Sequence, residues 1–207
     1  FAQFGYTVHE GDVIAGIAAR LDPVKDIPTL LRAVALAKKA CPQLRLAIAG
    51  DGKERKKLEA LTKELGLEDS VFFLGWVNDL DSFYGALDIN TLSSVSEAFP
   101  YALPEGARAH LATVASNVGG VPAIIEHGVT GLLIEPGDVR MLAAYLARYA
   151  LDENYRREMG EALYRRGKAD FSEEATGLRQ LEIYHAVFRM ERNRRDGVRD
   201  GVLICGA

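Results

Sequence analysis

The chain has 207 residues, of which 48% are hydrophobic and 26% charged, which is typical of a soluble globular protein with one good α/β domain and short for two. A net charge of −4 argues against non-specific nucleic-acid binding, because such binding depends on broad positive surfaces. Cys41 and Cys205 are too few and too scattered for a disulfide framework or a Cys-rich zinc site, which favours a reducing, cytoplasmic setting. The sequence contains no signal peptide and no uninterrupted apolar run of membrane-spanning length.

Apolar runs alternate with amphipathic segments along most of the chain. After a lead-in linker over residues 1–11, we expect strands over residues 12–19, 44–49, 71–74, 89–92 and 113–116, and a turn followed by a sixth strand over residues 128–134. We expect helices over residues 28–40, 54–65, 80–86, 123–126, 139–150 and 153–170, and a last one from Ser172 past Arg189. Strands that alternate with helices in this way predict a doubly wound parallel sheet of about six strands, a Rossmann-like α/β fold with C-terminal helices, because only that topology covers both faces of such apolar strands.

In such a sheet, ligands bind beyond the carboxyl ends of the strands, where the strand order reverses. Several distinctive residues follow predicted strands directly, namely Arg20, Lys25, Gly50, Trp76 and Glu97. We therefore expect them to share one edge of the sheet and to form one site.

The predicted domain extends over residues 12–190, and a different pattern follows it. Residues 192–199 are charged and poor in helix signals, which predicts a linker or a solvated end. Residues 201–207, G-V-L-I-C-G-A, are typical of a strand followed by a small-residue turn. We therefore assign residues 191–207 to a linker and the start of a further domain, and we interpret the abrupt ends of the chain as those of an excised piece.

The stretch over residues 93–120 contains two carboxylates, Glu97 and Glu105, with seven residues between them. Residues 98–103 form an apolar loop, and Pro104 stands where a helix could begin, because a fixed φ and a missing N–H cost nothing in a first helical turn. A helix N-terminus presents unpaired N–H donors and a partial positive charge, so a polar or anionic ligand suits it. The two glutamates could accept hydrogen bonds from hydroxyl groups at both ends of one ligand, or they could be two ordinary surface carboxylates.

This stretch resembles the E-x7-E region of the retaining, two-Rossmann-domain (GT-B) glycosyltransferases of family 4. The usual wording of that region is close to S-E-G-F-G-x-x-x-x-E-A-M-A-x-G-x-P-V-V-A-S-x-V-G-G. The resemblance, which covers residues 12–171, implies that Glu97 binds the donor sugar and that Glu105 binds the nucleotide ribose. The chain departs from the pattern where glycines, a turn glycine and a proline usually stand, at Ala98, Pro100, His110 and Ala112. These departures bear on the identity of the donor sugar more than on the nucleotide site.

Arg20 and Lys25 resemble the R-x4-K pair that holds the donor diphosphate in this family. The chemistry suits the role, since negative charge builds on the leaving diphosphate as the sugar–phosphate bond breaks, and fixed cations aimed there lower the barrier. A guanidinium can bind two phosphate oxygens while an ammonium acts as a point charge. The alternative is a solvated loop. With Glu97, this pair completes the predicted catalytic set.

The remaining candidate substrate contacts come from three loops. Gly50, Asp51 and Gly52 form a tight turn that would line the nucleotide pocket, although G-x-G-x-x-R after a second strand is not a dinucleotide-binding fingerprint. Trp76 and Val77 match the family's G-[FWY]-V turn beside the base, or Trp76 is simple packing. The apolar loop would contribute Ala98, Phe99, Pro100, Tyr101 and Leu103.

The resemblance implies the donor-nucleotide half of an enzyme that moves a sugar from a nucleotide diphosphate sugar to an acceptor with the anomeric configuration kept. It implies no metal and no cofactor besides the donor, because two cations can neutralise the diphosphate. The implied partner is an acceptor-binding N-terminal domain of the same parent chain, without which this half would be inactive. The parent enzyme would work in the cytoplasm, in peripheral contact with the inner face of the cell membrane.

Two other functional classes remain open. A non-hydrolysing nucleotide-sugar epimerase of similar architecture would keep its catalytic residues in the other domain. A non-catalytic nucleotide-sugar-binding module would share the pocket, although the complete set of two cations and two glutamates argues against loss of catalysis. The last seven residues also resemble the opening of polysaccharide pyruvyl transferases, which implies work in cell-surface polysaccharide biosynthesis.

Overall fold

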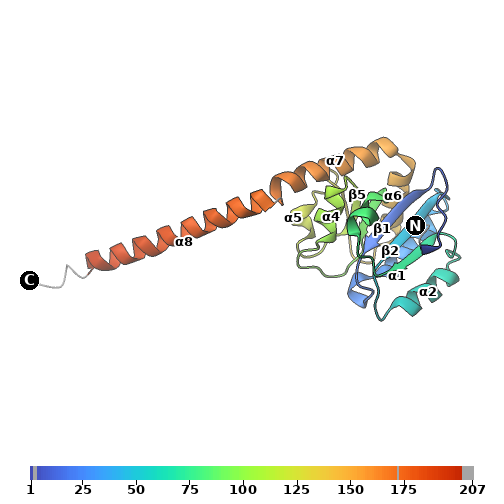
Figure 1. The fold of residues 1–207 in the computed structure, drawn as a ribbon, viewed down its shortest axis with the longest axis horizontal. Helices are drawn as coiled ribbons and strands as arrows, with labels where there is room; N and C mark the ends of the chain where they lie inside the picture. Colours follow the sequence, from blue (N-terminus) through green and yellow to red (C-terminus); the bar gives the residue numbers. More distant parts are fainter. Residues whose placement is uncertain (2–3, 172, 202–207) are drawn as a thin grey trace, which may run out of the picture. The chain divides into compact units, whose positions relative to one another are not determined.

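The computed structural model describes residues 1, 4–171 and 173–201, and in them a six-stranded parallel sheet lies between two layers of helices (Figure 1). The strands are β1 (Val13–Ala18), β2 (Leu44–Ala49), β3 (Val71–Gly75), β4 (Ile89–Leu92), β5 (Ala112–Ser116) and β6 (Leu132–Ile134). They are arranged in the order β3-β2-β1-β4-β5-β6, and each neighbouring pair is parallel. The predicted doubly wound sheet is confirmed, and its strand order reverses between β1 and β4.

The described helices are α1 (Ile27–Ala37), α2 (Arg55–Glu64), α3 (Leu80–Gly85), α4 (Ala102–Arg108), α5 (Val121–Ile124), α6 (Val139–Leu151), α7 (Glu153–Asp170) and α8 (Glu173–Gly201). A single 3₁₀ turn, η2 (Pro23–Lys25), precedes α1. Local chemistry sets several helix starts. The Asp79 carboxylate accepts a hydrogen bond from the Ser82 N–H at the start of α3, and Asp138 accepts one from the Met141 N–H at the start of α6.

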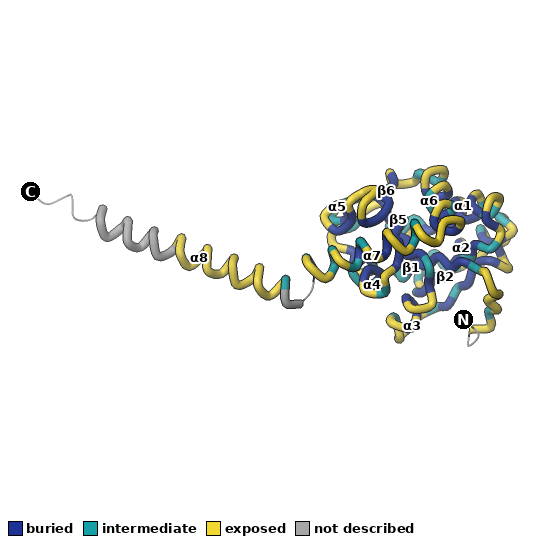
Figure 2. Tube along the Cα trace, turned by 90° about the horizontal axis from the view of Figure 1, so that it is seen from above, coloured by how far each residue is buried: buried dark blue, intermediate teal, exposed yellow. Residues whose placement is uncertain are grey.

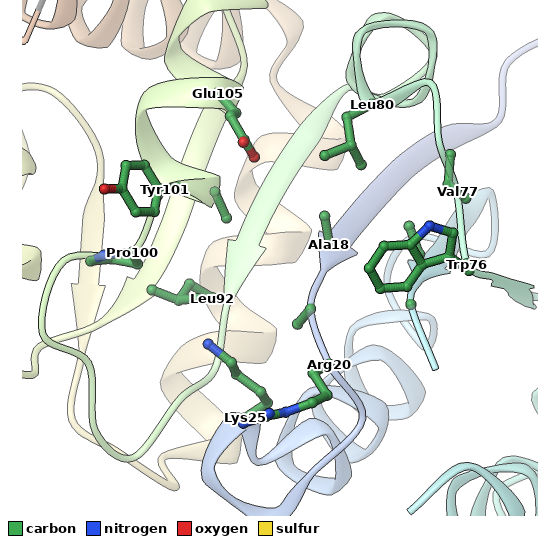
Figure 3. A pocket seen from close by; sticks show the side chains of 14 residues that line it. Ala18, Arg20, Lys25, Trp76, Val77, Leu80, Leu92, Pro100, Tyr101 and Glu105 are labelled. Carbon is green, nitrogen blue, oxygen red and sulfur yellow. The ribbon is translucent and has the colours of Figure 1, made fainter. Parts of the chain in front are cut away.

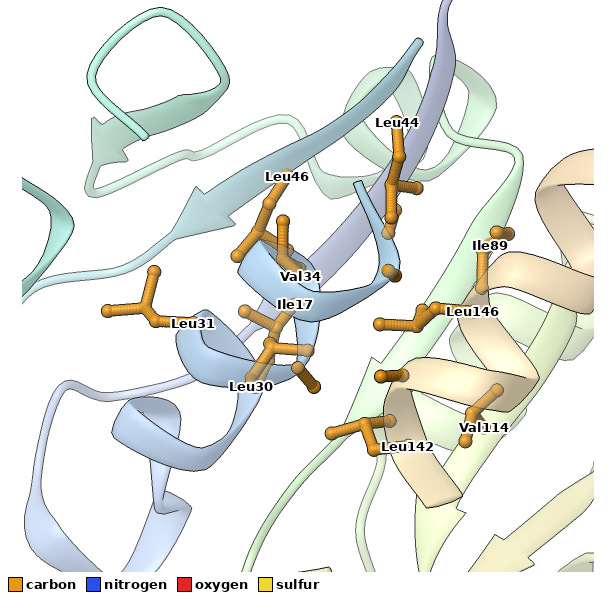
Figure 4. Close-up of a cluster of buried hydrophobic side chains, with 14 of the residues drawn as sticks. Ile17, Leu30, Leu31, Val34, Leu44, Leu46, Ile89, Val114, Leu142 and Leu146 are labelled. Carbon is orange, nitrogen blue, oxygen red and sulfur yellow. The ribbon is translucent and has the colours of Figure 1, made fainter. Parts of the chain in front are cut away.

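Each face of the sheet has its own apolar core. On one face, α1 and α6 pack against the strands through fully buried residues such as Ile17, Leu30 and Leu146 (Figure 4). The cluster on the other face includes Phe72 of β3 and Phe83 of α3. The strands are buried from both sides (Figure 2), which explains why their sequences show continuous apolar runs and little alternation.

The start of the chain packs onto this second face, where the sequence predicted only a lead-in linker. The Tyr6 ring stacks on Phe72 with a centroid distance of 4.6 Å, and the Phe1 ring lies 5.8 Å from the same side chain. The Tyr6 hydroxyl also accepts a hydrogen bond from the Phe73 N–H at 3.1 Å. Isolated aromatic residues give no periodic signal, so the sequence did not reveal this packing.

The chain divides into two compact units, Phe1–Gly167 and Lys168–Ala207. The second unit contains α8, which covers residues 192–199, so the expectation of little helix in that stretch is wrong. Four of the eight residues are arginines, which have good helix propensity, although the stretch has no apolar periodicity. The assignment of residues 191–207 to a linker stays a prediction. Ser172 and the predicted strand and turn after Gly201 lie outside the described residues. None of the described helices is long and apolar enough to cross a membrane.

The remaining differences concern element boundaries. Within the turn and strand predicted over residues 128–134, the strand is Leu132–Ile134. The turn comes first, where the Val129 and Thr130 N–H groups both donate to the Glu126 carbonyl. The helix predicted over residues 123–126 instead covers Val121–Ile124, with Pro122 in its first turn. Helix ends are where sequence patterns are least informative.

Candidate functional site

A cavity of about 310 Å³ opens at the carboxyl ends of β1, β2 and β4, beside the point where the strand order reverses (Figure 3). The residues predicted for the site that line it are Arg20, Lys25, Gly50, Trp76, Val77, Pro100, Tyr101 and Glu105. The other lining residues are mostly small or aliphatic, namely Ala18, Ala19, Ala49, Leu80, Leu92 and Ala102. The structure therefore brings most of the predicted residues together in one apolar cleft with charged groups at its walls.

Six predicted site residues are not part of the cavity lining. They are Asp51, Gly52, Glu97, Ala98, Phe99 and Leu103. Leu103 is part of α4 and is fully buried, so its side chain supports the fold and cannot reach a ligand in this conformation. Glu97 is linked to the cavity through Lys25.

Lys25 and Glu97 form an ion pair at the edge of the cavity. The Lys25 Nζ lies 2.6 Å from Glu97 Oε1, and the two side chains are 21% and 11% exposed. The Ser94 hydroxyl donates to the same carboxylate oxygen at 2.6 Å. Two donors on one oxygen hold the Glu97 carboxylate in a single orientation.

Two further hydrogen bonds, both accepted by backbone carbonyls, join the same two loops. The Ser93 hydroxyl donates to the Lys25 carbonyl at 2.8 Å, and the Val95 N–H donates to the Val24 carbonyl at 2.8 Å. The turn that carries Lys25 and the loop that leads to Glu97 therefore form one unit.

Arg20 stands at the mouth of the cavity with its side chain 77% exposed. Its Nε donates to Asp22 Oδ2 at 2.6 Å, and Asp22 Oδ1 accepts from the Val24 N–H at the start of η2. Burial disfavours the charged form of Asp22, but the Arg20 guanidinium and the Val24 N–H outweigh it and lower the pKa of Asp22. Asp22 therefore stays ionised and connects Arg20 to the turn that carries Lys25.

Two glycines in the turn after β5, Gly119 and Gly120, pack directly against the backbone of the Glu97 loop. Gly119 has φ +50°, and a Cβ there would lie 1.6 Å from the Glu97 carbonyl oxygen. A Cβ on Gly120 would lie 2.2 Å from the Ala98 carbonyl oxygen. The turn after β5 can approach the loop this closely only without side chains.

Glu105 occupies the opposite wall, in the first turn of α4. The helix begins at Ala102, two residues before the start predicted at Pro104. Pro104 is tolerated there because the N–H groups of a first helical turn have no partner within the helix. The Tyr84 hydroxyl donates to Glu105 Oε2 at 2.9 Å.

The loop after β2 packs tightly on the loop after β1. A Cβ on Gly50 would lie 1.9 Å from the Ala19 carbonyl oxygen, and one on Gly52 would lie 2.4 Å from the Leu21 carbonyl oxygen. The Asp51 carboxylate accepts from the Gly52 N–H at 2.7 Å. Gly50 lines the cavity, and the close approach at both glycines holds the loop after β2 against the loop after β1.

Trp76 stands on the wall opposite Tyr101 (Figure 3), and it is 77% exposed. Its indole Nε1 donates to Asn78 Oδ1 at 2.9 Å. Such exposure excludes simple core packing, one of the two interpretations of this residue, and leaves a large aromatic face available to a ligand.

The sequence matches the family of group 1 glycosyl transferases over residues 2–166. The chain belongs to this family. It is 32% identical over 149 residues to N-acetyl-alpha-D-glucosaminyl L-malate synthase of Bacillus anthracis, which covers 72% of this chain and 39% of the relative. The chain thus spans about two-fifths of the length of that relative.

Two solved structures share the fold of this group 1 glycosyl transferase chain. Anabaena Alr3699/HepE, in complex with UDP-glucose, superposes with a TM-score of 0.80 at 26% identity over 89% of this chain and 51% of that one. The C-terminal domain of the group 1 family protein LpcC from Francisella tularensis superposes with a TM-score of 0.73 at 25% identity over 78% and 87%. The chain therefore corresponds to the C-terminal domain of a GT-B glycosyltransferase.

Sequence reasoning missed several residues that hold the site of this family member together. Tyr84, Ser94 and Asn90 are buried side chains with polar groups. They donate hydrogen bonds to Glu105, to Glu97 and to the Ala102 carbonyl, respectively. A polar residue in an apolar segment was the available signal, but its partner lies in another element and could not be read from the sequence.

Proposed function

We propose that the chain is the donor-binding domain of an enzyme that transfers a sugar from a nucleotide diphosphate sugar to an acceptor with retention of configuration. The observation that carries this proposal is one cleft with cations at one end, Arg20 and Lys25, and the Glu105 carboxylate on the opposite wall. The Anabaena Alr3699/HepE structures are complexes with UDP and with UDP-glucose, which supports a nucleotide-sugar donor.

The geometry supports the binding of different parts of the donor by different residues along the cleft. The diphosphate would lie against Arg20 and Lys25, the ribose hydroxyls against Glu105, and the sugar toward Glu97. When the sugar–phosphate bond breaks, its electron pair passes to the phosphate oxygen, and the two cations stabilise that charge. Glu97 would orient the sugar by accepting from its hydroxyl groups. An N-terminal domain of the parent chain would supply the acceptor, and the parent enzyme would act in cell-surface polysaccharide biosynthesis.

The purified 207-residue chain is expected to bind a nucleoside diphosphate weakly and to transfer no sugar by itself, because a facing domain that closes over the donor is not part of it. Isothermal titration with UDP, GDP and ADP, and with the matching nucleosides, measures the binding. The absence of binding to all three diphosphates would overturn the proposed function. Sugar transfer by the purified chain without a partner would overturn the proposed need for a second domain.

Glu105→Gln is expected to weaken nucleoside diphosphate binding by about 1.5–3 kcal/mol, the size of a hydrogen bond to a charged group. Glu97→Gln is expected to leave this affinity nearly intact, because Glu97 bonds to Lys25 and Ser94 and is not part of the cavity lining. In the full-length parent, however, Glu97→Gln is expected to impair transfer. Calorimetry of both variants decides the assignment, and equal losses of affinity would refute it.

A further inference from the structure

Tyr84 contacts the cavity only through another residue. It belongs to α3 and is 2% exposed, and its hydroxyl donates to Glu105 Oε2 at 2.9 Å. Glu105 lines the cavity, whereas Tyr84 does not. The other carboxylate oxygen, Oε1, has no hydrogen-bond partner among the described residues. One oxygen of Glu105 is thus held by the protein and the other is available to a ligand.

The protonation state of Tyr84 suits this contact. Burial, with the nearby Glu105 carboxylate, raises the pKa of Tyr84 far above its ordinary value. The hydroxyl therefore keeps its proton and donates a hydrogen bond to Glu105 at neutral pH. The ring is held in the apolar cluster under the sheet, with the Phe83 ring packed edge-on at 5.4 Å.

The backbone of α4 is fixed as well. The Asn90 side chain, which is fully buried in β4, donates from Nδ2 to the Ala102 carbonyl at 3.0 Å. A Cβ on Gly106 would lie 2.4 Å from that Nδ2 atom, so a glycine allows the helix to sit directly on Asn90. With its backbone and one oxygen fixed, the Glu105 carboxylate has little freedom left to lose when a ligand binds.

We infer that Tyr84 is a positioning residue that orients the Glu105 carboxylate, and that this arrangement makes the site select ribose over deoxygenated forms of the same nucleotide. The inference rests on the proposed function. A preorganised acceptor loses binding energy when its hydroxyl partner is removed, because the bound nucleotide then shields the carboxylate oxygen from water without pairing it. Without the Tyr84 hydroxyl, the carboxylate can rotate and the penalty for a missing ribose hydroxyl falls.

The test compares Tyr84→Phe with Tyr149→Phe. Tyr149 is also a buried tyrosine with a raised pKa, but its hydroxyl bonds to the Thr113 carbonyl and it is not part of the cavity lining. Each variant is titrated with the tightest binder among UDP, GDP and ADP and with the 2′,3′-dideoxy form of that nucleotide. Thermal melting confirms that both variants are folded.

Tyr84→Phe is expected to weaken binding of the ribose nucleotide about 5-fold, the effect of one modest hydrogen bond, and to leave binding of the dideoxy form unchanged. Tyr149→Phe is expected to change neither. Combined with Glu105→Gln, Tyr84→Phe is expected to add little, because both variants disturb the same contact.

Equal weakening of both nucleotides would show that Tyr84 only supports the fold, and unchanged binding would show that Glu105 needs no anchor; either result overturns the inference. If the unsubstituted chain binds no diphosphate, the proposed function itself fails. If Glu105→Gln loses the preference for ribose while Tyr84→Phe keeps it, the proposed function stands and this inference alone fails.

Discussion

Gly119→Ala is expected to lower the free energy of unfolding by about 2–5 kcal/mol, a large share of the stability of an ordinary domain. Gly119 has φ +50°, a conformation that costs an alanine about 1–2 kcal/mol. In addition, the new Cβ would lie 1.6 Å from the Glu97 carbonyl oxygen, which is backbone and cannot rotate away. The turn or the Glu97 loop must therefore move.

Gly128→Ala is the matched control for this substitution. Gly128 also has a positive φ, +78°, but nothing lies within 4 Å of the position of its Cβ. The difference between the two variants isolates the close approach under Glu97 from the cost of the backbone conformation. Urea denaturation followed by far-UV circular dichroism is the suitable measurement, since the single tryptophan, Trp76, is already 77% exposed when folded. Equal losses at the two glycines would contradict the proposed packing role of Gly119.

Lys25→Ala and Arg20→Ala are each expected to weaken nucleoside diphosphate binding by about 1.5–3 kcal/mol, the size of a charge-assisted hydrogen bond. The loss at Lys25 is expected to be the larger, because its side chain is 21% exposed and that of Arg20 is 77% exposed, so water screens Arg20 more. Binding of the corresponding nucleoside, which has no phosphate, should hardly change.

Lys39→Ala serves as the control for net charge. Lys39 is exposed and follows α1, near the amino-terminal edge of the sheet and away from the cavity. The double variant Lys25→Ala with Glu97→Gln tests whether Lys25→Ala acts by leaving the Glu97 carboxylate without its cation, since the double variant removes both charges. A loss of diphosphate binding that disappears in the double variant, or an equal loss for nucleoside and diphosphate, would show that Lys25 supports the fold and does not bind phosphate.

The sequence predicted the order and type of nearly all elements in the sheet domain. Each strand is buried on both faces and each helix on one, so the pattern of burial is recorded in consecutive residues and can be read locally. The same argument failed for a segment that has no pattern of apolar residues. Residues 192–199 carry no apolar stripe, yet they are part of α8.

The resemblance to a known family supplied the identities of the four charged site residues, and their position after strands predicted a shared edge. Sequence did not predict how they contact one another. Lys25 and Glu97 are 72 residues apart and Tyr84 and Glu105 are 21 apart, and no local pattern records such pairs. Leu103 illustrates the same point, because its place in the loop predicted a ligand contact and its fully buried side chain faces the core.

The sequence by itself determined the doubly wound fold, the family and the edge of the sheet where the charged residues lie, because periodicity and motif spacing are properties of neighbouring residues. Only the tertiary structure decided which oxygen of each glutamate is held by the protein, that Trp76 faces solvent, and that Gly119 must lack a side chain. These features depend on distances of a few ångströms between elements that are remote in the chain. Such distances are set by how the helices and loops pack on the sheet.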